Sequence, residues 1–273
     1  QLQQFVYHSG TLMKPLFSIA KRVPVPQKRI VFAEGEDERV LRAVQIIIDE
    51  HLATPILIGR PAVIEHRIGK FGLRIKAGED FEIVNPENDS RFRDFWQTYL
   101  ALTERKGVTT SFAKLEMRRR NTLIGSILIS KGMADGMICG TVGNSATHLK
   151  YIDEVIGHEP GANVYGAMSG LILPGRQVFL VDTHINIDPT ACELAELTLM
   201  AASEMRKLGL APKVALLSHS NFGSSNAPSA VKMREVLALL QKADPTLEVD
   251  GEMHGDSALD ESIRATTVTS SPL

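Results

Sequence analysis

The chain has 273 residues, of which 44% are hydrophobic and 23% are charged, and its net charge is −2. This composition is typical of a globular protein with a sizeable core, and it gives no argument for a nucleic-acid or anionic-membrane partner. Two cysteines are too few for a disulfide framework, and neither an apolar run long enough to span a membrane nor a signal peptide is present, so we expect a reducing, cytoplasmic location.

Two α/β domains behind a short lead-in are expected. Residues 1–27 combine an apolar stretch with a proline-rich linker, and a glycine-rich break near 157–161 separates residues 28–157 from residues 158–273. Because the chain lacks an initiator Met and ends on Thr-Val-Thr-Ser-Ser-Pro-Leu, we expect a piece of a longer polypeptide, truncated at its C-terminus.

Short apolar segments alternate with helical patterns in the first domain. We predict strands at 29–33, 55–58, 81–84 and 135–139. Helices are predicted at 37–50, capped by Asp37, from Pro61 onward, at 90–102 and, in two pieces, at 111–131. Apolar strands separated by helices are typical of a parallel sheet covered on both faces. The predicted fold class is therefore α/β with a mostly parallel, doubly wound sheet.

The second domain begins differently. Pro174-Gly-Arg favours a hairpin between strands at 164–173 and 178–182. A helix opened by Pro189 and Thr190 follows and ends near Leu208. Further strands are predicted at 214–217 and 247–249, with a helix between them.

Two polar loops each join a strand to a helix. One follows residue 217 and contains Ser218, Ser220, Asn221, Gly223, Ser224, Ser225 and Asn226; the other runs from Gly140 to Lys150 and contains Asn144 and Ser145. Such junctions direct unpaired helix N–H groups toward an anion, beyond the carboxyl ends of the strands. A helix cap without a ligand explains the same residues, and no Walker or dinucleotide glycine pattern is present.

Metal binding and nucleophilic catalysis are both weakly supported. The histidines beside carboxylates, His184 and His254, lack the spacing of a zinc site or a calcium loop, so no metal is predicted. Ser218 and His219 are strand neighbours that point to opposite faces, outside any Gly-x-Ser-x-Gly elbow. Arg105, near a helix end, either complements the helix dipole or binds phosphate.

Three segments carry a family resemblance: Asp182-Thr-His-Ile-Asn-Ile-Asp-Pro-Thr, Leu217-Ser-His-Ser and Gly251-Glu-Met-His-Gly-Asp-Ser-Ala. They resemble, in that order, the Asp…Asn-x-Asp-Pro-Thr segment, the strand-to-loop junction and the Gly-Glu/Pro-Leu-x-x-Asp-Ala-Ala segment of the phosphate acetyltransferases. The resemblance covers nearly all of residues 28–262. It implies a two-domain, phosphotransacetylase-like fold related to isocitrate and isopropylmalate dehydrogenases.

A more specific resemblance is carried by Phe5-Val-Tyr-His-Ser-Gly-Thr-Leu-Met-Lys-Pro, Ser218-His-Ser-Asn-Phe-Gly-Ser and Val249-Asp-Gly-Glu-Met-His-Gly-Asp. These segments resemble the C-terminal part of bacterial multidomain NADP-dependent malic enzymes. That resemblance implies upstream catalytic domains that oxidatively decarboxylate malate to pyruvate with NADP and a divalent metal. This chain would hold no cofactor of its own, bind acetyl-CoA or a related acyl-CoA as an allosteric effector, and form a homo-oligomer, which the apolar lead-in and the Met-rich segment 197–205 also favour.

The chain departs from the acetyltransferase pattern at charged positions. Phe222 stands where the family has lysine, Thr147 replaces an aspartate, and Lys150 replaces an arginine that could bind phosphate through two parallel bonds. The first arginine of the family's Arg-Lys-His-Lys-Gly motif is absent, and its Ser-Arg and Asp, which deprotonate the CoA thiol, lie beyond residue 273. We therefore expect a regulatory rather than catalytic domain, the alternative being an active phosphate acetyltransferase.

We expect an acyl-CoA in a cleft between the two halves. The candidate contacts for the acyl-CoA or its phosphates are Ser220, Asn221, Gly223, Ser224, Asn144, Ser145, Lys150 and Arg105. A decarboxylating dehydrogenase of the isocitrate type is disfavoured, because the sequence has no arginine-rich clamp for an acid and fold alone does not define function.

Overall fold

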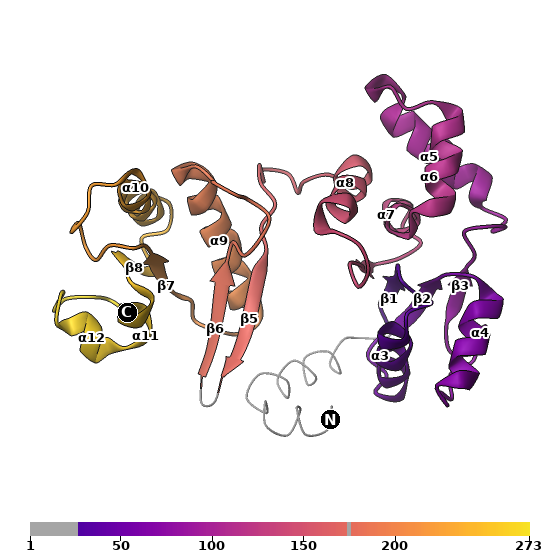
Figure 1. Ribbon diagram of the computed structural model, residues 1–273, viewed down its shortest axis with the longest axis horizontal. Coiled ribbons are helices and arrows are strands. Elements are labelled where there is room, and N and C mark those ends of the chain that lie inside the picture. The colour runs from indigo at the N-terminus through magenta and orange to yellow at the C-terminus, as the bar shows by residue number, and fades with distance from the viewer. Residues whose placement is uncertain (1–26, 174–175) are drawn as a thin grey trace. The chain divides into compact units, whose positions relative to one another are not determined.

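The computed structural model describes residues 27–173 and 176–273. The lead-in and linker predicted at 1–27 fall almost wholly outside these residues, as does most of the predicted Pro174-Gly-Arg turn. The chain divides into two units, Gln1–Gly157 and His158–Leu273 (Figure 1). Each unit has its own sheet and core and is described by itself.

The first unit is built on a four-stranded parallel sheet with the order β3-β2-β1-β4. Its strands are β1 (Arg29–Phe32), β2 (Thr54–Ile58), β3 (Glu82–Val84) and β4 (Gly136–Ile138). Its helices are α3 (Glu38–Asp49), α4 (Pro61–Lys70), α5 (Phe92–Thr103), α6 (Thr110–Arg119), α7 (Asn121–Ser130) and α8 (Ser145–Val155), with a 3-10 turn η1 (Glu104–Lys106) after α5. Because β2 and β3 extend the sheet on one side of β1 and β4 on the other, the strand order reverses between β1 and β4.

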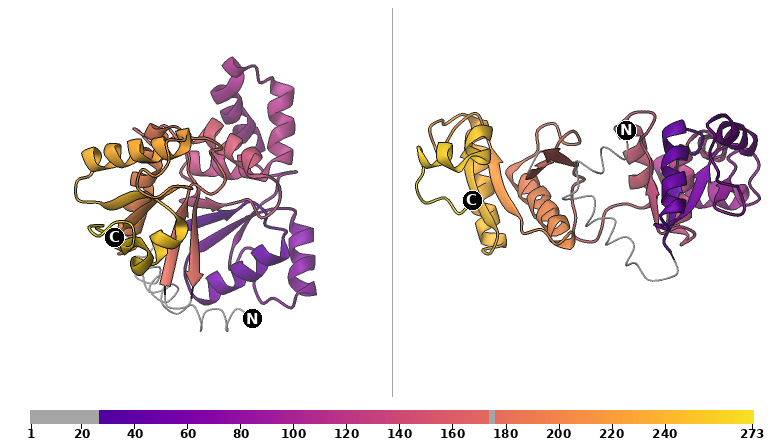
Figure 2. Two further views of the ribbon diagram at one scale, coloured as in Figure 1. Left: turned by 60° about the vertical axis from the view of Figure 1, so that its left-hand side comes forward. Right: turned by 90° about the horizontal axis from the view of Figure 1, so that it is seen from below.

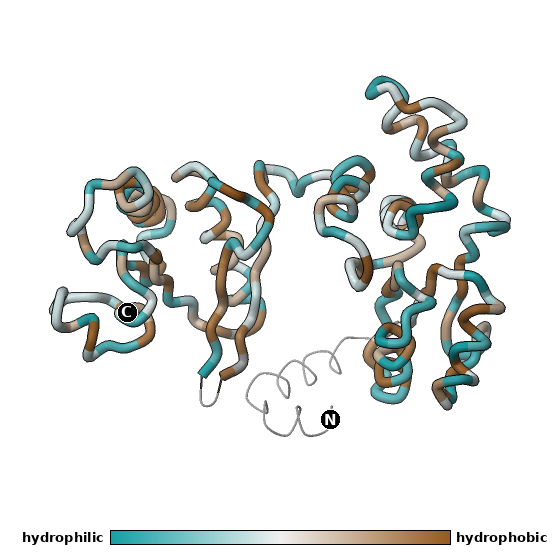
Figure 3. Tube along the Cα trace, in the orientation of Figure 1, coloured by the Kyte–Doolittle hydropathy of each residue, from teal (hydrophilic) through white to brown (hydrophobic). Residues whose placement is uncertain are grey.

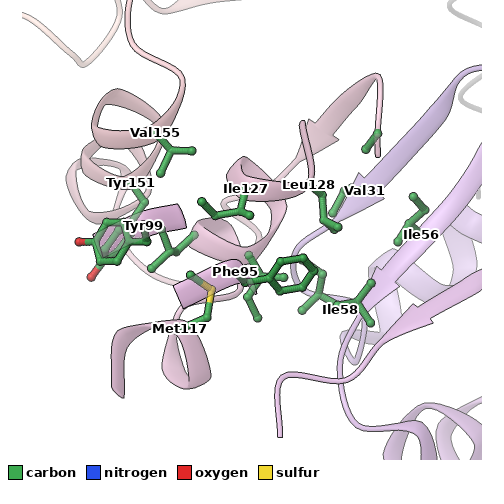
Figure 4. Packing of buried hydrophobic residues seen from close by; sticks show 14 of the residues in the cluster. Val31, Ile56, Ile58, Phe95, Tyr99, Met117, Ile127, Leu128, Tyr151 and Val155 are labelled. Carbon is green, nitrogen blue, oxygen red and sulfur yellow. The ribbon is translucent and has the colours of Figure 1, made fainter. Parts of the chain in front are cut away.

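Apolar side chains alternate between the two faces of this sheet, as the two-residue period of a strand requires. Val31, Ile56 and Ile58 pack with the helices of one face, α5 to α8 (Figure 4). Phe32 and Leu57, their neighbours in sequence, belong to a second core under α3 and α4. The predicted parallel sheet covered on both faces is therefore confirmed.

The second unit contains two pairs of strands. An antiparallel hairpin joins β5 (Met168–Leu173) to β6 (Arg176–Val181), and a parallel pair joins β7 (Lys213–Leu217) to β8 (Glu248–Met253). The helices are α9 (Ala191–Lys207), α10 (Pro228–Ala243), α11 (Gly255–Leu259) and α12 (Glu261–Ala265). The hairpin lies along α9 (Figure 2), and its strands are hydrophobic over much of their length (Figure 3).

The core of the second unit lies where α9 and α10 cover the β7–β8 pair. Its buried members are Ala195, Ala202, Leu216, Val236, Leu240, Leu247 and Val249. Helix α9 begins with a capping box, in which the Thr190 side chain accepts from the Glu193 amide and Glu193 accepts in return from the Thr190 amide. The helix start expected at this position is therefore confirmed.

Three features of the second unit differ from the sequence-based expectation. Strand β5 starts at Met168 rather than Val164, which is buried without joining a ladder. Strand β8 continues through Met253 instead of ending at Val249, because pairing with β7 extends past the polar Asp250. The two short helices α11 and α12 were not expected. Pairing and packing with distant residues, which local patterns do not record, decide all three.

None of the helices in the described part of the chain combines the length and hydrophobicity that crossing a bilayer requires.

Candidate functional site

The carboxyl ends of β1 and β4 meet at the point where the strand order of the first unit reverses. Two cavities open there, of about 360 Å³ and about 380 Å³. They share Glu34, Asn121 and Val142 in their walls and are therefore adjoining. A reversal of strand order at the carboxyl edge is the usual ligand position in open α/β sheets.

The loop after β4, residues 139–144 (the β4 loop), is fixed by His148. The Val142 carbonyl accepts from His148 Nε2 at 2.8 Å, and His148 Nδ1 lies 2.6 Å from the Thr122 hydroxyl. The Gly140 amide donates to Glu34 Oε1 at 3.0 Å. The other oxygen, Glu34 Oε2, is buried and has no hydrogen-bond partner among the described residues. Sequence reasoning missed Glu34 and His148, because Glu34 bonds to Gly140, 106 residues away, and His148 contacts Thr122, 26 residues away.

Asn144 and Ser145 begin helix α8. The Asn144 side chain accepts from the Thr147 amide at 2.8 Å and caps the helix. The amides of Ser145 and Ala146 have no acceptor within the described part of the chain and are available to a ligand. Asn144 and Thr147 both line the larger of the two cavities. This junction therefore keeps the free donors that the sequence predicted.

Arginines supply the positive charge at the larger cavity. Arg119 and Arg120, at the end of α6, both line it. Arg120 Nε donates to Glu116 at 3.3 Å, whereas Arg119 is exposed and its guanidinium has no partner among the described residues. The run of three arginines at 118–120 was the available sequence signal, and it was overlooked. Among the described residues, Arg119 is thus a cation of this cavity without a partner.

Lys150 and Arg105 do not join this cavity. Lys150 lies on α8 with its ammonium 3.9 Å from Glu154 Oε1, and Arg105 is exposed on η1. Neither lines either of the two cavities at the sheet edge. Of the four candidates in this unit, Asn144 lines the cavity and Ser145 follows it at the start of α8.

Helix α8 is joined to both helices of the α5–α6 hairpin by buried tyrosines (Figure 4). The Tyr99 hydroxyl on α5 donates to Glu154 at 2.8 Å, and the Tyr151 hydroxyl on α8 donates to Glu116 on α6. Burial, together with the hydrogen bond to Glu116, raises the pKa of Tyr151 to about 12. These two hydrogen bonds, one donated to α8 and one donated from it, hold the part of α8 that follows its N-terminus.

The second polar loop, residues 218–227 between β7 and α10 (the β7 loop), contains a tight turn. Phe222 and Gly223 have φ angles of 46° and 86°, and the Ser224 amide donates to the Asn221 carbonyl at 3.1 Å. Two consecutive positive φ values are the geometry of a type I′ turn, which glycine and asparagine favour and phenylalanine does not. The space above Gly223 is open.

A buried carboxylate lies behind this turn. Glu252, on β8, is fully buried, and its Oε1 accepts from the Ser220 hydroxyl at 2.9 Å, the Gly223 amide at 2.9 Å and Arg234 at 2.8 Å. The Phe222 amide donates to the Glu252 carbonyl at 2.7 Å. Burial alone would raise the pKa of Glu252, but hydrogen bonds from Gly223 and Ser220 and the charge of Arg234 outweigh it and lower the pKa.

Most donors of the β7 loop are therefore engaged, contrary to the expectation of free groups awaiting an anion, although the buried Ser218 hydroxyl has no hydrogen-bond partner among the described residues. The Asn221 amide donates to Ser224 Oγ at 3.2 Å, and Asn221 Oδ1 accepts from the His254 amide at 2.7 Å. Helix α10 begins at Pro228, which has no N–H to offer. Ser220, Asn221, Gly223 and Ser224 are brought together, but they are bonded to one another and to Glu252.

The Asp182 segment, which carries part of the family resemblance, forms a local hydrogen-bond network in the second unit. Asp182 accepts from the Asn186 amide at 2.6 Å, from the Asn186 side chain at 2.7 Å and from the Ala167 amide at 2.9 Å. These bonds lower the pKa of Asp182 against the opposing effect of burial.

No group of three or more potential metal ligands gathers within residues 27–173 and 176–273.

Residues 11–273 match the model of the phosphate acetyl/butaryl transferase family, and the chain belongs to that family. A solved phosphotransacetylase from Streptococcus pyogenes superimposes with a TM-score of 0.82 at 30% identity, covering 96% of this chain and 79% of that one. The phosphotransacetylase-like α/β fold is thereby confirmed.

Among its relatives, the chain is more similar to malic enzymes than to phosphate acetyltransferases. It is 51% identical over its whole length to the NADP-dependent malic enzyme of Salmonella typhimurium, of which it spans 36%. It is 46% identical, also over its whole length, to the NAD-dependent malic enzyme of Rhizobium meliloti, of which it spans 35%. The chain thus spans about a third of the length of these relatives, and the resemblance to malic enzymes expected from three short segments is confirmed.

Proposed function

We propose that this chain is the phosphotransacetylase-like regulatory domain of a malic enzyme, and that it binds acetyl-CoA as an allosteric effector. The parent enzyme would oxidatively decarboxylate malate to pyruvate in domains upstream, where the nicotinamide coenzyme, NADP or NAD, and a divalent metal would bind. Binding here would inhibit that reaction, because an effector that prefers one of two assembled states shifts the equilibrium between them.

The cavity of about 380 Å³ at the β1–β4 edge of the first unit is the observation that carries this proposal. On one side it offers the free Arg119 guanidinium and the N-terminus of α8 behind Asn144, both of which favour phosphate groups. On another side it has Glu34, whose unpaired oxygen needs an N–H donor. Coenzyme A carries phosphates, an amino group on its adenine and two amides, so one molecule can satisfy both sides.

Acetyl transfer is the less favoured alternative. Transfer to phosphate needs cations for the phosphate and a base for the CoA thiol. Phe222 is uncharged where the family has lysine, and the nearest carboxylate, Glu252, is buried and already accepts three hydrogen bonds. A regulatory role needs only the binding surface.

We further propose that the domain assembles as a homo-oligomer. The β5–β6 hairpin exposes Leu171, Leu173 and Leu180, and Met200 on α9 is also exposed. Apolar strands that remain open in a monomer are commonly covered by a partner.

The test uses the full-length protein. Calorimetric titration with acetyl-CoA should give saturable binding, and NADPH formation from malate should be inhibited over the same concentrations. Arg119→Ala should weaken both by about tenfold, since it removes a charge-assisted contact. Lys150→Ala should weaken inhibition only slightly, because Lys150 lines neither of the two cavities at the sheet edge, and it should leave malate saturation unchanged.

Arg74→Ala is the matched control, because Arg74 is an exposed arginine paired with Asp49 far along the chain from the cavity. Absence of heat at millimolar acetyl-CoA would reject the effector role. Rapid formation of acetyl phosphate from acetyl-CoA and phosphate would establish the alternative activity. An inhibition curve unchanged by Lys150→Ala removes that residue from the site.

A further inference from the structure

Glu34 belongs to the walls of both cavities at the carboxyl edge of the first unit's sheet. Its Oε1 accepts from the Gly140 amide, whereas its Oε2 is buried and has no hydrogen-bond partner among the residues that the structure describes. A buried carboxylate oxygen without a donor raises the free energy of the folded protein. A ligand with an N–H group would remove that cost.

The backbone on both sides of Glu34 is fixed. The Ala33 amide donates to the Ile138 carbonyl at 3.0 Å, and the Gly35 amide donates to the Ile58 carbonyl at 3.1 Å. The last torsion of a glutamate side chain has a broad minimum. Oε2 can therefore turn toward the cavities by a limited rotation that keeps the hydrogen bond to Oε1.

The two cavities differ in charge. The cavity of about 380 Å³, here the Arg119 cavity, has two guanidiniums, Arg119 and Arg120, and one carboxylate, Glu34. In the cavity of about 360 Å³, here the Arg60 cavity, carboxylates outnumber guanidiniums: the charged residues are Glu34, Glu36, Asp37, Glu87, Arg60, Arg67 and Arg118. Phosphate groups are therefore attracted to the Arg119 cavity and not to the Arg60 cavity.

Two of the carboxylates in the Arg60 cavity are already paired. Arg60 donates to both oxygens of Glu36, each at 2.9 Å, and Asp37 lies 3.0 Å from the Arg39 guanidinium. Glu87 is exposed to solvent. Glu34 is thus the carboxylate at which a bound ligand would gain most from donating a hydrogen bond.

Flat and apolar groups complete the Arg60 cavity. Pro86 and Val142 line it, and Val142 is largely exposed. The Arg118 guanidinium, which also lines it, lies over the Phe92 ring at 4.9 Å from the centroid. Guanidinium planes and apolar side chains are surfaces on which nucleobases stack. A planar base with an N–H donor therefore fits this cavity.

We propose that the two cavities bind one nucleotide, with its phosphates in the Arg119 cavity and its base in the Arg60 cavity, and that Glu34 selects adenine by accepting a hydrogen bond from the 6-amino group. For an acyl-CoA, the domain then recognises the adenosine bisphosphate end rather than the acyl group, and this part rests on the proposed function. The selection of the base by Glu34 does not.

The experiment compares adenosine 3′,5′-bisphosphate with the analogue whose base is unsubstituted purine, using the full-length protein. Binding is read as slowed hydrogen exchange in peptides spanning the β4 loop and the start of α8, so that a coenzyme site elsewhere in the polypeptide does not contribute. The wild-type protein should bind the adenine ligand about tenfold more tightly, because purine has no 6-amino group and leaves Glu34 Oε2 unpaired.

Glu34→Gln should reverse the preference between two other bases. The glutamine carbonyl would keep the bond from Gly140, so that its amide nitrogen takes the place of Oε2 and donates. This variant should bind inosine 3′,5′-bisphosphate, whose 6-oxo group accepts, more tightly than the adenosine ligand. Glu38→Gln is the matched control, because Glu38 is exposed and paired with Arg42, and it should behave as wild type.

Equal affinity of the wild-type protein for the adenine and purine ligands would overturn the inference. A Glu34→Gln protein that keeps the wild-type preference for adenine would overturn it too. If that variant does not fold, the comparison of adenine with purine in the wild-type protein decides the role of Glu34 alone.

CoA and acetyl-CoA form the second arm, and both should slow exchange of the same peptides with similar affinity. Binding of acetyl-CoA that adenosine 3′,5′-bisphosphate does not displace would overturn the inference and keep the proposed function. An adenine-selective response to the bisphosphate, without a response to acetyl-CoA, would refute the proposed function and keep the inference. A response to neither ligand would refute both.

Discussion

The β4 loop of the first unit and the β7 loop of the second unit are similar in composition and differ in what holds them. The β4 loop is fixed from outside by His148, and the α8 amides beyond its Asn144 cap, like the nearby Arg119, have no partner among the described residues. The β7 loop is fixed from within by Glu252, which uses the very donors that a ligand would need. Small polar residues after a strand therefore do not identify an anion site until their partners are known.

The largest effect on either loop is expected from substitution of Gly251, which precedes Glu252 and has a φ of 133°. A Cβ there would lie 2.7 Å from the Leu216 carbonyl oxygen, so Gly251→Ala must displace β8 from β7. We expect a loss of about 3 kcal/mol in the free energy of unfolding, from combined strain and collision. Denaturant titration measures it.

Gly255→Ala is the control for this substitution, because Gly255 has open space around it. The displacement should also free the β7 loop, so that its amides exchange faster while those of the β4 loop do not change. Equal stability of the two glycine variants would show that Glu252 is not held by this strand contact.

A smaller effect is expected at Tyr151, which supports the first unit's loop through α8. Tyr151→Phe leaves the buried Glu116 with one donor fewer, at a cost of about 2 kcal/mol. The folded-state pKa of about 12 lies above the usual value of about 10, so the folded protein holds this proton more tightly than the unfolded chain. The stabilisation is complete below pH 10 or so and is lost as the pH rises toward 12.

Unfolding measured between neutral and strongly alkaline pH checks this. The wild-type protein should lose stability more steeply than Tyr151→Phe over that range, whereas Tyr99, which donates to Glu154, is present in both proteins. If the stabilities of the two proteins fell in parallel with pH, the assignment of the alkaline loss of stability to Tyr151 would be contradicted.

The pattern of strands and helices was predictable because parallel strands covered on both faces leave continuous apolar runs, as Ile56 to Ile58 do. The role of Glu252 was not. It stands in a polar run that is typical of a loop, and its partners Ser220 and Gly223 lie 32 and 29 residues away. Arg119 was likewise missed, since only the folded chain brings the end of α6 to the α8 cap.

The smallest effect is expected from substitution of Asn144, the N-cap residue of α8. Asn144→Ala should cost about 1 kcal/mol, because the Thr147 amide loses its acceptor. Asn144→Asp should keep that stability, since a carboxylate caps equally well, yet it places a negative charge at the helix end where phosphates would bind. Thermal unfolding and acetyl-CoA titration, run on both variants, separate the two roles. Undiminished affinity in Asn144→Asp would exclude an anion at this helix end.

The paired tyrosines have a mechanical consequence. Tyr99 and Tyr151 fasten α8 to two different helices with bonds of opposite direction, one donated toward α8 and one donated from it. Any tilt of α8 at its exposed end is therefore transmitted into the α5–α6 hairpin, on which Leu102, Phe112 and Leu115 are exposed. A small displacement of the exposed end of α8 would thus move an exposed apolar surface elsewhere on the same unit.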